Sequence, residues 1–217
     1  MKGDIIILEE HHKNAAKIIV SKIDAAIKKA NTRFAISIAG ESGSGKSEMA
    51  AAIAEELLNQ KITSLILGQD DYFNLPPKLN DAKRREDPEW LGPHVEVDLE
   101  RLEKNLLDAI SGEIYLIKPL IDYDKSTIGE KTVDLAGVKV IIAEGTYTSL
   151  LRHVDRKIFI SANRLDTLEH RKKRNRGNEV GDPFIERILE TEHKIIAGHK
   201  FLADFLITKN FNVLAMD

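Results

Sequence analysis

The chain contains no cysteine. Disulfides, thiolate nucleophiles and cysteine-ligated zinc sites are therefore excluded, and we expect a reducing compartment, the cytoplasm. Long hydrophobic runs are also lacking. The apolar stretch near the N-terminus, residues 5–8, has only four residues, which is too short for a signal sequence or a membrane span. We therefore expect no membrane partner.

Neither sign of charge dominates the sequence. Lysine and arginine together number 32 against 35 acidic residues, which gives a formal net charge of −3. A chain of this balance has no broad basic surface for DNA or RNA, so we expect no nucleic-acid partner. None of the seven histidines forms an H-E-x-x-H pattern or another recognised zinc spacing. Any anion that the protein binds must therefore be bound by a few cationic or N–H groups at one site.

One segment matches the phosphate-binding pattern G-x-x-x-x-G-K-[ST] at every fixed position and follows an apolar run, residues 34–39, that is typical of a strand. Its glycines let the backbone approach phosphate oxygens, and a helix that begins near Lys46 directs N–H groups and its positive dipole end at them. Ser47 supplies a hydroxyl to Mg²⁺. We therefore predict ATP and Mg²⁺ as cofactors, with these cofactor-binding residues: Gly40, Glu41, Ser42, Gly43, Ser44, Gly45, Lys46, Ser47 and Glu48.

Hydrophobic periodicity predicts an alternation of strands and helices. The predicted helices are 11–30, 47–58, 98–111, 165–176 and 183–198, and the predicted strands are 34–39, 62–67, 114–117, 138–143, 157–161 and 204–208. The segment 118–133 is typical of a hairpin, and the proline-rich segment 74–93 is predicted to be an ordered loop or small lid. This pattern indicates an α/β fold of the P-loop NTPase type, with three layers, a mostly parallel five-stranded sheet, helices on both faces and a helical lid.

The domain organisation follows from these elements. We predict an N-terminal strand and helix extension, 1–32, followed by a P-loop domain, 33–217, with a lid at about 171–183. The amphipathic helix 11–30 is expected to pack against its own sheet or against a second copy of the chain. In the second case the protein would form a homo-oligomer.

Acidic residues close two of the predicted strands. Asp70 and Asp71 follow strand 62–67, where a carboxylate at the rim of a parallel sheet would serve as a base for a substrate hydroxyl or as a metal ligand; the alternative is a turn or helix cap. Glu144 ends strand 138–143, where such an acid holds Mg²⁺, usually through water, unless it is only structural.

Five cations lie within residues 171–176, beside a glycine-rich segment that resembles a hinge. They would form a solvated helix end, or they would swing onto the phosphates and stabilise transition-state charge. We assign catalytic roles to Lys46, Asp70, Arg171, Arg174 and Arg176 on the second interpretation.

Several side chains near these motifs are candidates for contact with the substrate: Asp71, Tyr72, Phe73, His94 and Tyr123. The aromatic rings would stack on a flat substrate, or they would line the core. His94 would touch the substrate, or it would be an exposed loop residue.

The chain resembles the uridine kinase and phosphoribulokinase family of P-loop small-molecule kinases, which includes nicotinamide riboside kinase. The resemblance spans about residues 34–211 and rests on segments 40–47, 69–73, 141–145 and 203–207 and on the arginine-rich lid. It implies that Asp70 is the catalytic base and that Glu144 is the acid of the family's E-G element. The family's F-D-H-P-like segment is absent, because residues 90–94 have the sequence Trp-Leu-Gly-Pro-His. The P-x-Y-D-F element is altered to Pro-Leu-Ile-Asp-Tyr at 119–123.

These observations predict a Mg²⁺-dependent ATP kinase that transfers the γ-phosphoryl group to a hydroxyl of a small metabolite, a nucleoside in the first instance. Alternative acceptors are nicotinamide riboside, pantothenate, a sugar or a phosphosugar. A nucleotide-binding regulatory protein without transfer activity is the alternative of a different class. An ATPase or GTPase is disfavoured because the sequence has no N-K-x-D element and no D-E pair at the end of strand 138–143.

Overall fold

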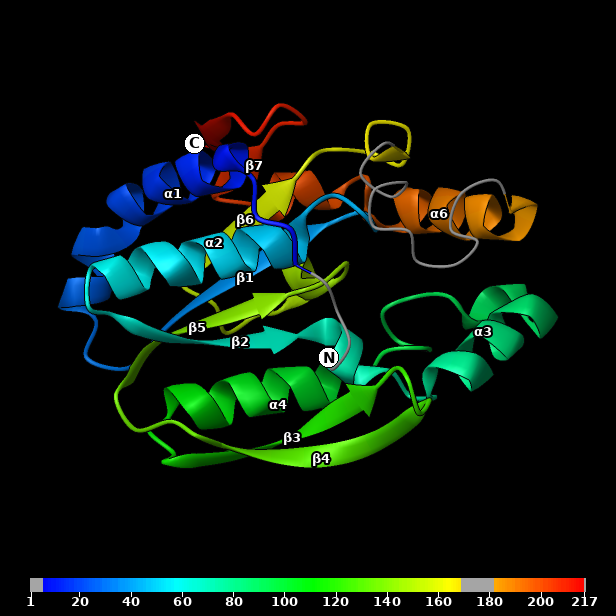
Figure 1. The fold of residues 1–217 in the computed structure, drawn as a ribbon, viewed down its shortest axis with the longest axis horizontal. Helices are drawn as coiled ribbons and strands as arrows, with labels where there is room; N and C mark the ends of the chain where they lie inside the picture. Colours follow the sequence, from blue (N-terminus) through cyan, green and yellow to red (C-terminus); the bar gives the residue numbers. More distant parts are fainter. Residues whose placement is uncertain (1–5, 169–181, 217) are drawn as a thin grey trace.

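The computed structural model describes residues 6–168 and 182–216. Its centre is a six-stranded sheet with the order β2–β5–β1–β6–β7–β8 (Figure 1). Five of the strands pair in parallel, and β8 pairs antiparallel with β7 at the edge. The strands are β1 Phe34–Gly40, β2 Thr63–Gly68, β5 Val138–Glu144, β6 Arg156–Ile160, β7 Phe205–Ile207 and β8 Val213–Ala215. The predicted five-stranded sheet is thus extended by β8, whose three residues are too few to show a period.

Helices cover both faces of this sheet, as predicted. Along β1, alternate side chains point to opposite faces, so Ile36 and Ile38 join one core while Ala35 and Ala39 join the other. The first core packs against α1 (Glu10–Lys29) and α2 (Lys46–Asn59), which lie side by side in Figure 1.

The N-terminal helix α1 packs against the sheet of its own chain. Its side chains Ile19, Val20, Ile23 and Ile27 are at most 1% exposed and belong to the same core as α2 and the strands. Their spacing of three or four residues places them on one side of the helix. Of the two interpretations of this amphipathic helix, packing against its own sheet is confirmed.

The opposite face is covered by α4 (Leu99–Ile110) and by a hairpin of β3 (Tyr115–Asp122) and β4 (Thr127–Asp134). Asp98 caps α4 by accepting a hydrogen bond of 2.9 Å from the backbone N–H of Arg101. The hairpin agrees with the prediction for 118–133, although its first strand begins earlier and runs on past the predicted short strand 114–117.

Two further helices extend beyond the carboxyl ends of the parallel strands (Figure 1). The prediction of a loop at 74–93 is wrong in part, because α3 (Pro77–Glu86) forms there with a proline in its first turn, where the missing N–H costs nothing. The helix α6 (Pro183–Ile196) agrees with the prediction. The predicted helix 165–176 and lid 171–183 fall largely on residues 169–181, outside the described residues. No helix in the described part of the chain is long and apolar enough to cross a membrane.

A buried ion pair attaches the hairpin to the end of β2. The Lys118 ammonium donates to Asp71 Oδ2, and Asp71 Oδ1 accepts a hydrogen bond of 3.0 Å from the backbone N–H of Ile121. The side chains of Lys118 and Asp71 are 7% and 2% exposed. The hairpin is therefore held to the main sheet by charge as well as by packing.

We predict that Asp71→Asn lowers the free energy of unfolding by about 3–5 kcal/mol, because the buried Lys118 ammonium loses its counter-charge. Urea denaturation followed by circular dichroism measures this change. The double variant Asp71→Asn/Lys118→Met should recover most of the loss, since it leaves no unpaired charge. Equal stability of wild type and Asp71→Asn would contradict the assignment.

Candidate active site

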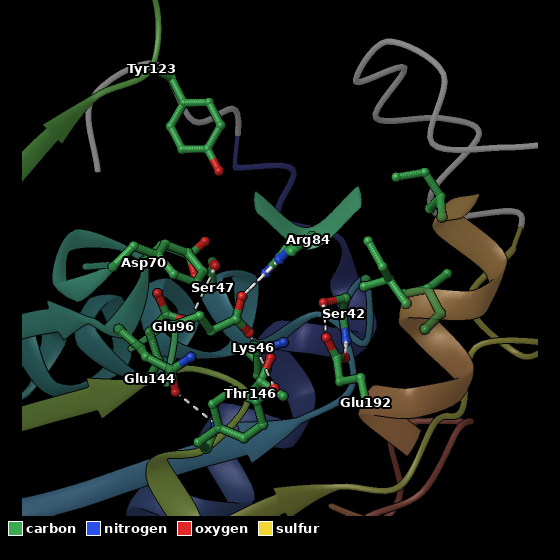
Figure 2. A pocket seen from close by; sticks show the side chains of 17 residues that line it. Ser42, Lys46, Ser47, Asp70, Arg84, Glu96, Tyr123, Glu144, Thr146 and Glu192 are labelled. Carbon is green, nitrogen blue, oxygen red and sulfur yellow. Dashed lines mark hydrogen bonds and ion pairs between the residues drawn. The ribbon is translucent and has the colours of Figure 1, made fainter. Parts of the chain in front are cut away.

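A cavity of about 200 Å³ lies at the carboxyl ends of β1, β2 and β5, the edge at which parallel α/β sheets bind ligands. Residues from the P-loop, the two strand ends, α3 and α6 line it (Figure 2). The described residues thus bring together the phosphate-binding motif, the two acidic positions Asp70 and Glu144, and Arg84 from the predicted loop or small lid 74–93.

The P-loop joins β1 to α2 and has the conformation that its glycines allow. Gly45 has a φ of 92°, in the left-handed region, and α2 begins at the next residue, Lys46. A side chain at Gly40 would meet the Ser44 hydroxyl at 2.8 Å and the Ile160 carbonyl at 2.9 Å. The Lys46 ammonium donates to the Glu41 carbonyl across the loop at 2.8 Å. The loop is therefore folded, and Lys46 lines the cavity in front of the helix N-terminus.

Two carboxylates line the cavity together with Ser47: Asp70, which follows β2, and Glu144, which ends β5. Gly68 at the end of β2 pairs with Glu144 at the end of β5, so Asp70 and Glu144 are brought to the same edge. The Ser47 hydroxyl donates to Glu144 Oε2 at 3.3 Å. Burial, and then the negative charge of Asp70, raise the pKa of Glu144 to about 7. Hard oxygen donors with an excess of negative charge suit a divalent cation.

A buried glutamine fixes the turn after β5. Gln69 Oε1 accepts a hydrogen bond of 2.7 Å from the backbone N–H of Tyr147. A side chain at Gly145 would come within 2.2 Å of the Gln69 Cβ, so this position requires glycine. The requirement for glycine after Glu144 is therefore explained by local packing. Gly145 leaves room for the Gln69 side chain, and Gln69 in turn holds Tyr147 beside the cavity.

The side of the cavity away from the P-loop carries an ion pair between a buried carboxylate and a partly exposed arginine. Arg84, on α3, donates from Nε and Nη2 to Glu96 Oε2 at 2.7 and 2.6 Å. The Tyr147 hydroxyl lies 3.4 Å from Glu96 Oε1. Burial raises the pKa of Glu96, although Arg84 opposes this effect, and the phenol of Tyr147 also has a raised pKa because of burial.

The helix α6 closes the cavity beside the P-loop. Glu192 accepts hydrogen bonds from the Ser42 backbone N–H at 2.5 Å and from the Ser42 hydroxyl at 2.8 Å. Burial raises the pKa of Glu192, while Lys46 acts in the opposite direction. The helix that follows the predicted lid is thus bonded directly to the phosphate-binding loop.

The structure places some predicted site residues at the cavity and others away from it. Eight line it: Ser42, Gly43, Lys46, Ser47, Asp70, Phe73, Tyr123 and Glu144. The other P-loop residues, Gly40, Glu41, Ser44, Gly45 and Glu48, are not among the lining residues. The Glu41 carboxylate is bonded elsewhere, since it accepts from the Arg164 backbone N–H at 2.7 Å and lies 2.5 Å from His193 Nδ1.

Three residues predicted to contact the substrate do not reach the cavity. Asp71 is committed to Lys118 and the hairpin, and the Tyr72 hydroxyl donates to Asn105 in the core at 3.0 Å. His94 is exposed. The alternatives of a core ring for Tyr72 and an exposed loop residue for His94 describe these two positions better. Asp71 fits neither of its two interpretations, because its carboxylate is buried against Lys118 and the backbone of Ile121. Arg171, Arg174 and Arg176 lie outside the described residues.

Sequence reasoning missed Gln69, Arg84, Glu96, Tyr147 and Glu192 as lining residues. Arg84 belongs to the charged segment 74–93, which has no hydrophobic period and gave no sign of a helix, and Glu96 follows this segment. The one available signal was Pro76-Pro77, because a proline often opens a helix.

Comparisons with known proteins agree with this geometry. The family model described as Zeta toxin matches residues 18–115. The chain is 30% identical to the bifunctional alpha-galactosidase/sucrose kinase AgaSK of Mediterraneibacter gnavus; the match covers 85% of this chain but only 21% of that protein. It is 31% identical to the uridine kinase of Ureaplasma urealyticum, over 78% of this chain and 94% of that protein.

Solved structures share the fold at low sequence identity. D-glycerate 3-kinase from Cryptococcus neoformans aligns with a TM-score of 0.63 at 12% identity, covering 96% of this chain and 100% of that chain. Phosphoribulokinase from Rhodobacter spheroides aligns with a TM-score of 0.59 at 12% identity, covering 82% and 71%. With the P-loop, the strand-end acids and a full-length relative at 31% identity, the chain belongs to the uridine kinase and phosphoribulokinase family of P-loop small-molecule kinases.

Proposed function

We propose that this kinase transfers the γ-phosphoryl group of ATP to a hydroxyl of a nucleoside or sugar. One observation carries the proposal: Lys46, Ser47, Asp70 and Glu144 line a single cavity that continues past Asp70 toward aromatic side chains. A site that only bound nucleotide would have no need of a carboxylate at that position.

In the proposed reaction, the acceptor oxygen forms a bond to the γ-phosphorus while the bond from that phosphorus to the bridging oxygen of ADP breaks. Asp70 accepts the hydroxyl proton. Lys46 leaves the Glu41 carbonyl, 2.8 Å away in this structure, and binds the outer phosphates. Charge on the transferred group is stabilised by Lys46 and the loop amides. Arg171, Arg174 and Arg176 remain predicted to cover this group.

Mg²⁺ would be held by Ser47 and Glu144, with Asp70 close to it, and would neutralise phosphate charge when bound. Among residues 6–168 and 182–216, no group of three or more histidine or acidic side chains is arranged to hold a metal ion. The protein would therefore supply only part of the coordination shell, and phosphates and water would supply the rest, as Mg²⁺ prefers.

The acceptor class is supported by the composition of the cavity. Phe73, Tyr123 and Tyr147 offer ring faces, and Glu96 and Arg84 offer an acceptor and a donor of hydrogen bonds. Flat or ring-shaped molecules with several hydroxyls match both features. A uridine kinase and a sucrose kinase domain are named among the relatives, and both substrates are of this kind.

Release of ADP from MgATP, measured with uridine, cytidine, nicotinamide riboside, pantothenate, fructose and sucrose, tests the proposal. Acceptor-dependent turnover with one nucleoside or sugar is expected. ATP binding without stimulation by any of them would reject a nucleoside or sugar as the acceptor.

We predict that Asp70→Asn lowers kcat by about 10²–10⁴-fold, because the acceptor hydroxyl loses its base. The Kd for ATP should stay within about twofold of wild type, since Lys46 and the loop amides are unchanged. Steady-state kinetics and nucleotide titration measure the two quantities. Asp108→Asn, at an exposed position of α4 that pairs with Lys104, is the matched control. Near-normal kcat in Asp70→Asn would exclude the base role.

The raised pKa of Glu144 predicts a pH dependence of stability in the metal-free protein. Because the folded-state pKa, about 7, is above the ordinary value of 4.5, the folded chain holds this proton more tightly than the unfolded chain does. The resulting stabilisation is complete below about pH 4.5 and is lost as the pH rises through about 7.

Wild type should therefore lose up to about 3 kcal/mol of unfolding free energy relative to Glu144→Gln between pH 5 and pH 8. Chemical denaturation in the presence of EDTA measures both proteins. Glu190→Gln, at an exposed position of α6, should keep the wild-type pH profile. Parallel profiles for wild type and Glu144→Gln would show that Glu144 ionises normally.

A further inference from the structure

We propose that Glu192 is an internal competitor of the transferred phosphate, because its carboxylate holds a P-loop N–H that the γ-phosphate of ATP would take. The inference rests on the proposed function and adds a regulatory contact to the same site: the γ-phosphate and Glu192 cannot occupy Ser42 together. It concerns the wall of the cavity where α6 meets the P-loop.

The Glu192 carboxylate binds the loop as a phosphate would. Its Oε1 accepts from the Ser42 backbone N–H at 2.5 Å, and its Oε2 accepts from the Ser42 hydroxyl at 2.8 Å. Acceptance by both oxygens is the pattern of an ionised carboxylate. Backbone N–H groups of a P-loop are the donors that bind phosphate oxygens. Figure 2 shows Glu192 directed from α6 at Ser42.

The contact lies in the part of the site where the phosphate has to react. Four P-loop residues line the cavity, among them Ser42 and Lys46, and Asp70 lines the same cavity. In the proposed reaction the γ-phosphorus meets the acceptor oxygen beside Asp70, so the γ-phosphate contacts the loop at these lining residues. A phosphate oxygen at the Ser42 N–H would therefore displace Glu192.

Charge strengthens this competition. Burial raises the pKa of Glu192, and the nearby Lys46 acts in the opposite direction. ATP would bring several negative charges to the same lysine. The described lining residues already include four carboxylates and only two cations. If Glu192 stayed at the loop while ATP was bound, charge repulsion would be added to the lost hydrogen bond.

The position of Glu192 on α6 argues against a role in packing alone. Leu189, Glu192 and Ile196 are spaced by three and four residues and are 5%, 6% and 0% exposed, so they share the buried side of the helix. Leu189 lines the cavity, and Ile196 belongs to the core. An apolar residue would continue this stripe without the cost of burying a carboxylate. The contact with the phosphate-binding loop accounts for a carboxylate at this position.

The next residue of α6 makes a second contact with the loop, which serves as a control. His193 Nδ1 lies 2.5 Å from Glu41 Oε1. The His193 side chain is 45% exposed, and neither His193 nor Glu41 is among the lining residues of the cavity. Removal of the His193 ring therefore weakens the attachment of α6 to the loop without freeing the Ser42 N–H.

The test compares Glu192→Gln, which removes the charge, with Glu192→Leu, which continues the apolar stripe and cannot accept from Ser42. His193→Ala is one control. Glu190→Gln is the other, because Glu190 is an exposed carboxylate on the same helix that pairs with Lys194 at 3.1 Å. Calorimetric titration measures the Kd of MgATP and of MgADP for each full-length protein without acceptor. Thermal unfolding checks that each variant is folded, and turnover is measured with the nucleosides and sugars named above.

We expect the ATP Kd to fall at least about tenfold in both Glu192 variants, because the fraction of protein with a free Ser42 N–H rises toward one. The ADP Kd should fall by less than about threefold, since ADP lacks the competing phosphate. Both controls should match wild type within about twofold, because they leave the Glu192 contact in place.

An ATP Kd that is unchanged or higher in both Glu192 variants would overturn the inference. An equal gain in His193→Ala, or an equal gain for ADP, would also overturn it. Acceptor-dependent turnover of wild type would still support the proposed function in each of these cases. Tighter ATP binding confined to the Glu192 variants, without turnover of any acceptor, would support the competition and reject the proposed function.

Discussion

The parallel pairing of β2, β5 and β1 is the constraint on which the rest of the site depends. Gly68 and Ile38 both pair with Glu144, so three strands end at one edge. The P-loop follows β1, Asp70 follows β2, and Glu144 ends β5. Because the strands are buried on both faces, their register is fixed by the two cores. Functional groups far apart in the sequence thus meet without any flexible element having to bring them together.

The neighbouring carboxylates Asp70 and Asp71 lie in different surroundings at this edge. Asp71 is buried against Lys118 and fastens the hairpin, whereas Asp70 lines the cavity. The fixed side chain of Asp71 holds the backbone turn from which Asp70 projects. On the other side, α6 is bonded to the P-loop through Glu192 and Ser42, and α3 supplies Arg84. The cavity is therefore enclosed by elements that are each attached to the sheet or to the loop.

The sequence predicted the elements whose physical signal is local. The P-loop pattern predicted the loop between β1 and α2, and the apolar runs of β1 and β5 predicted the central strands. The helix α3 was missed because its sequence, PKLNDAKRRE, has no hydrophobic stripe. The separation of Asp70 from Asp71 and the pairing of Arg84 with Glu96 were not predictable, because both depend on tertiary contacts across the cavity or with the hairpin. The strand β8 was too short to detect.

A crystal structure with Mg²⁺, a non-hydrolysable ATP analogue and the acceptor that supports turnover tests the account most directly. We predict that the acceptor hydroxyl lies within hydrogen-bond distance of the Asp70 carboxylate and faces the γ-phosphate. An acceptor bound away from Asp70 would contradict it.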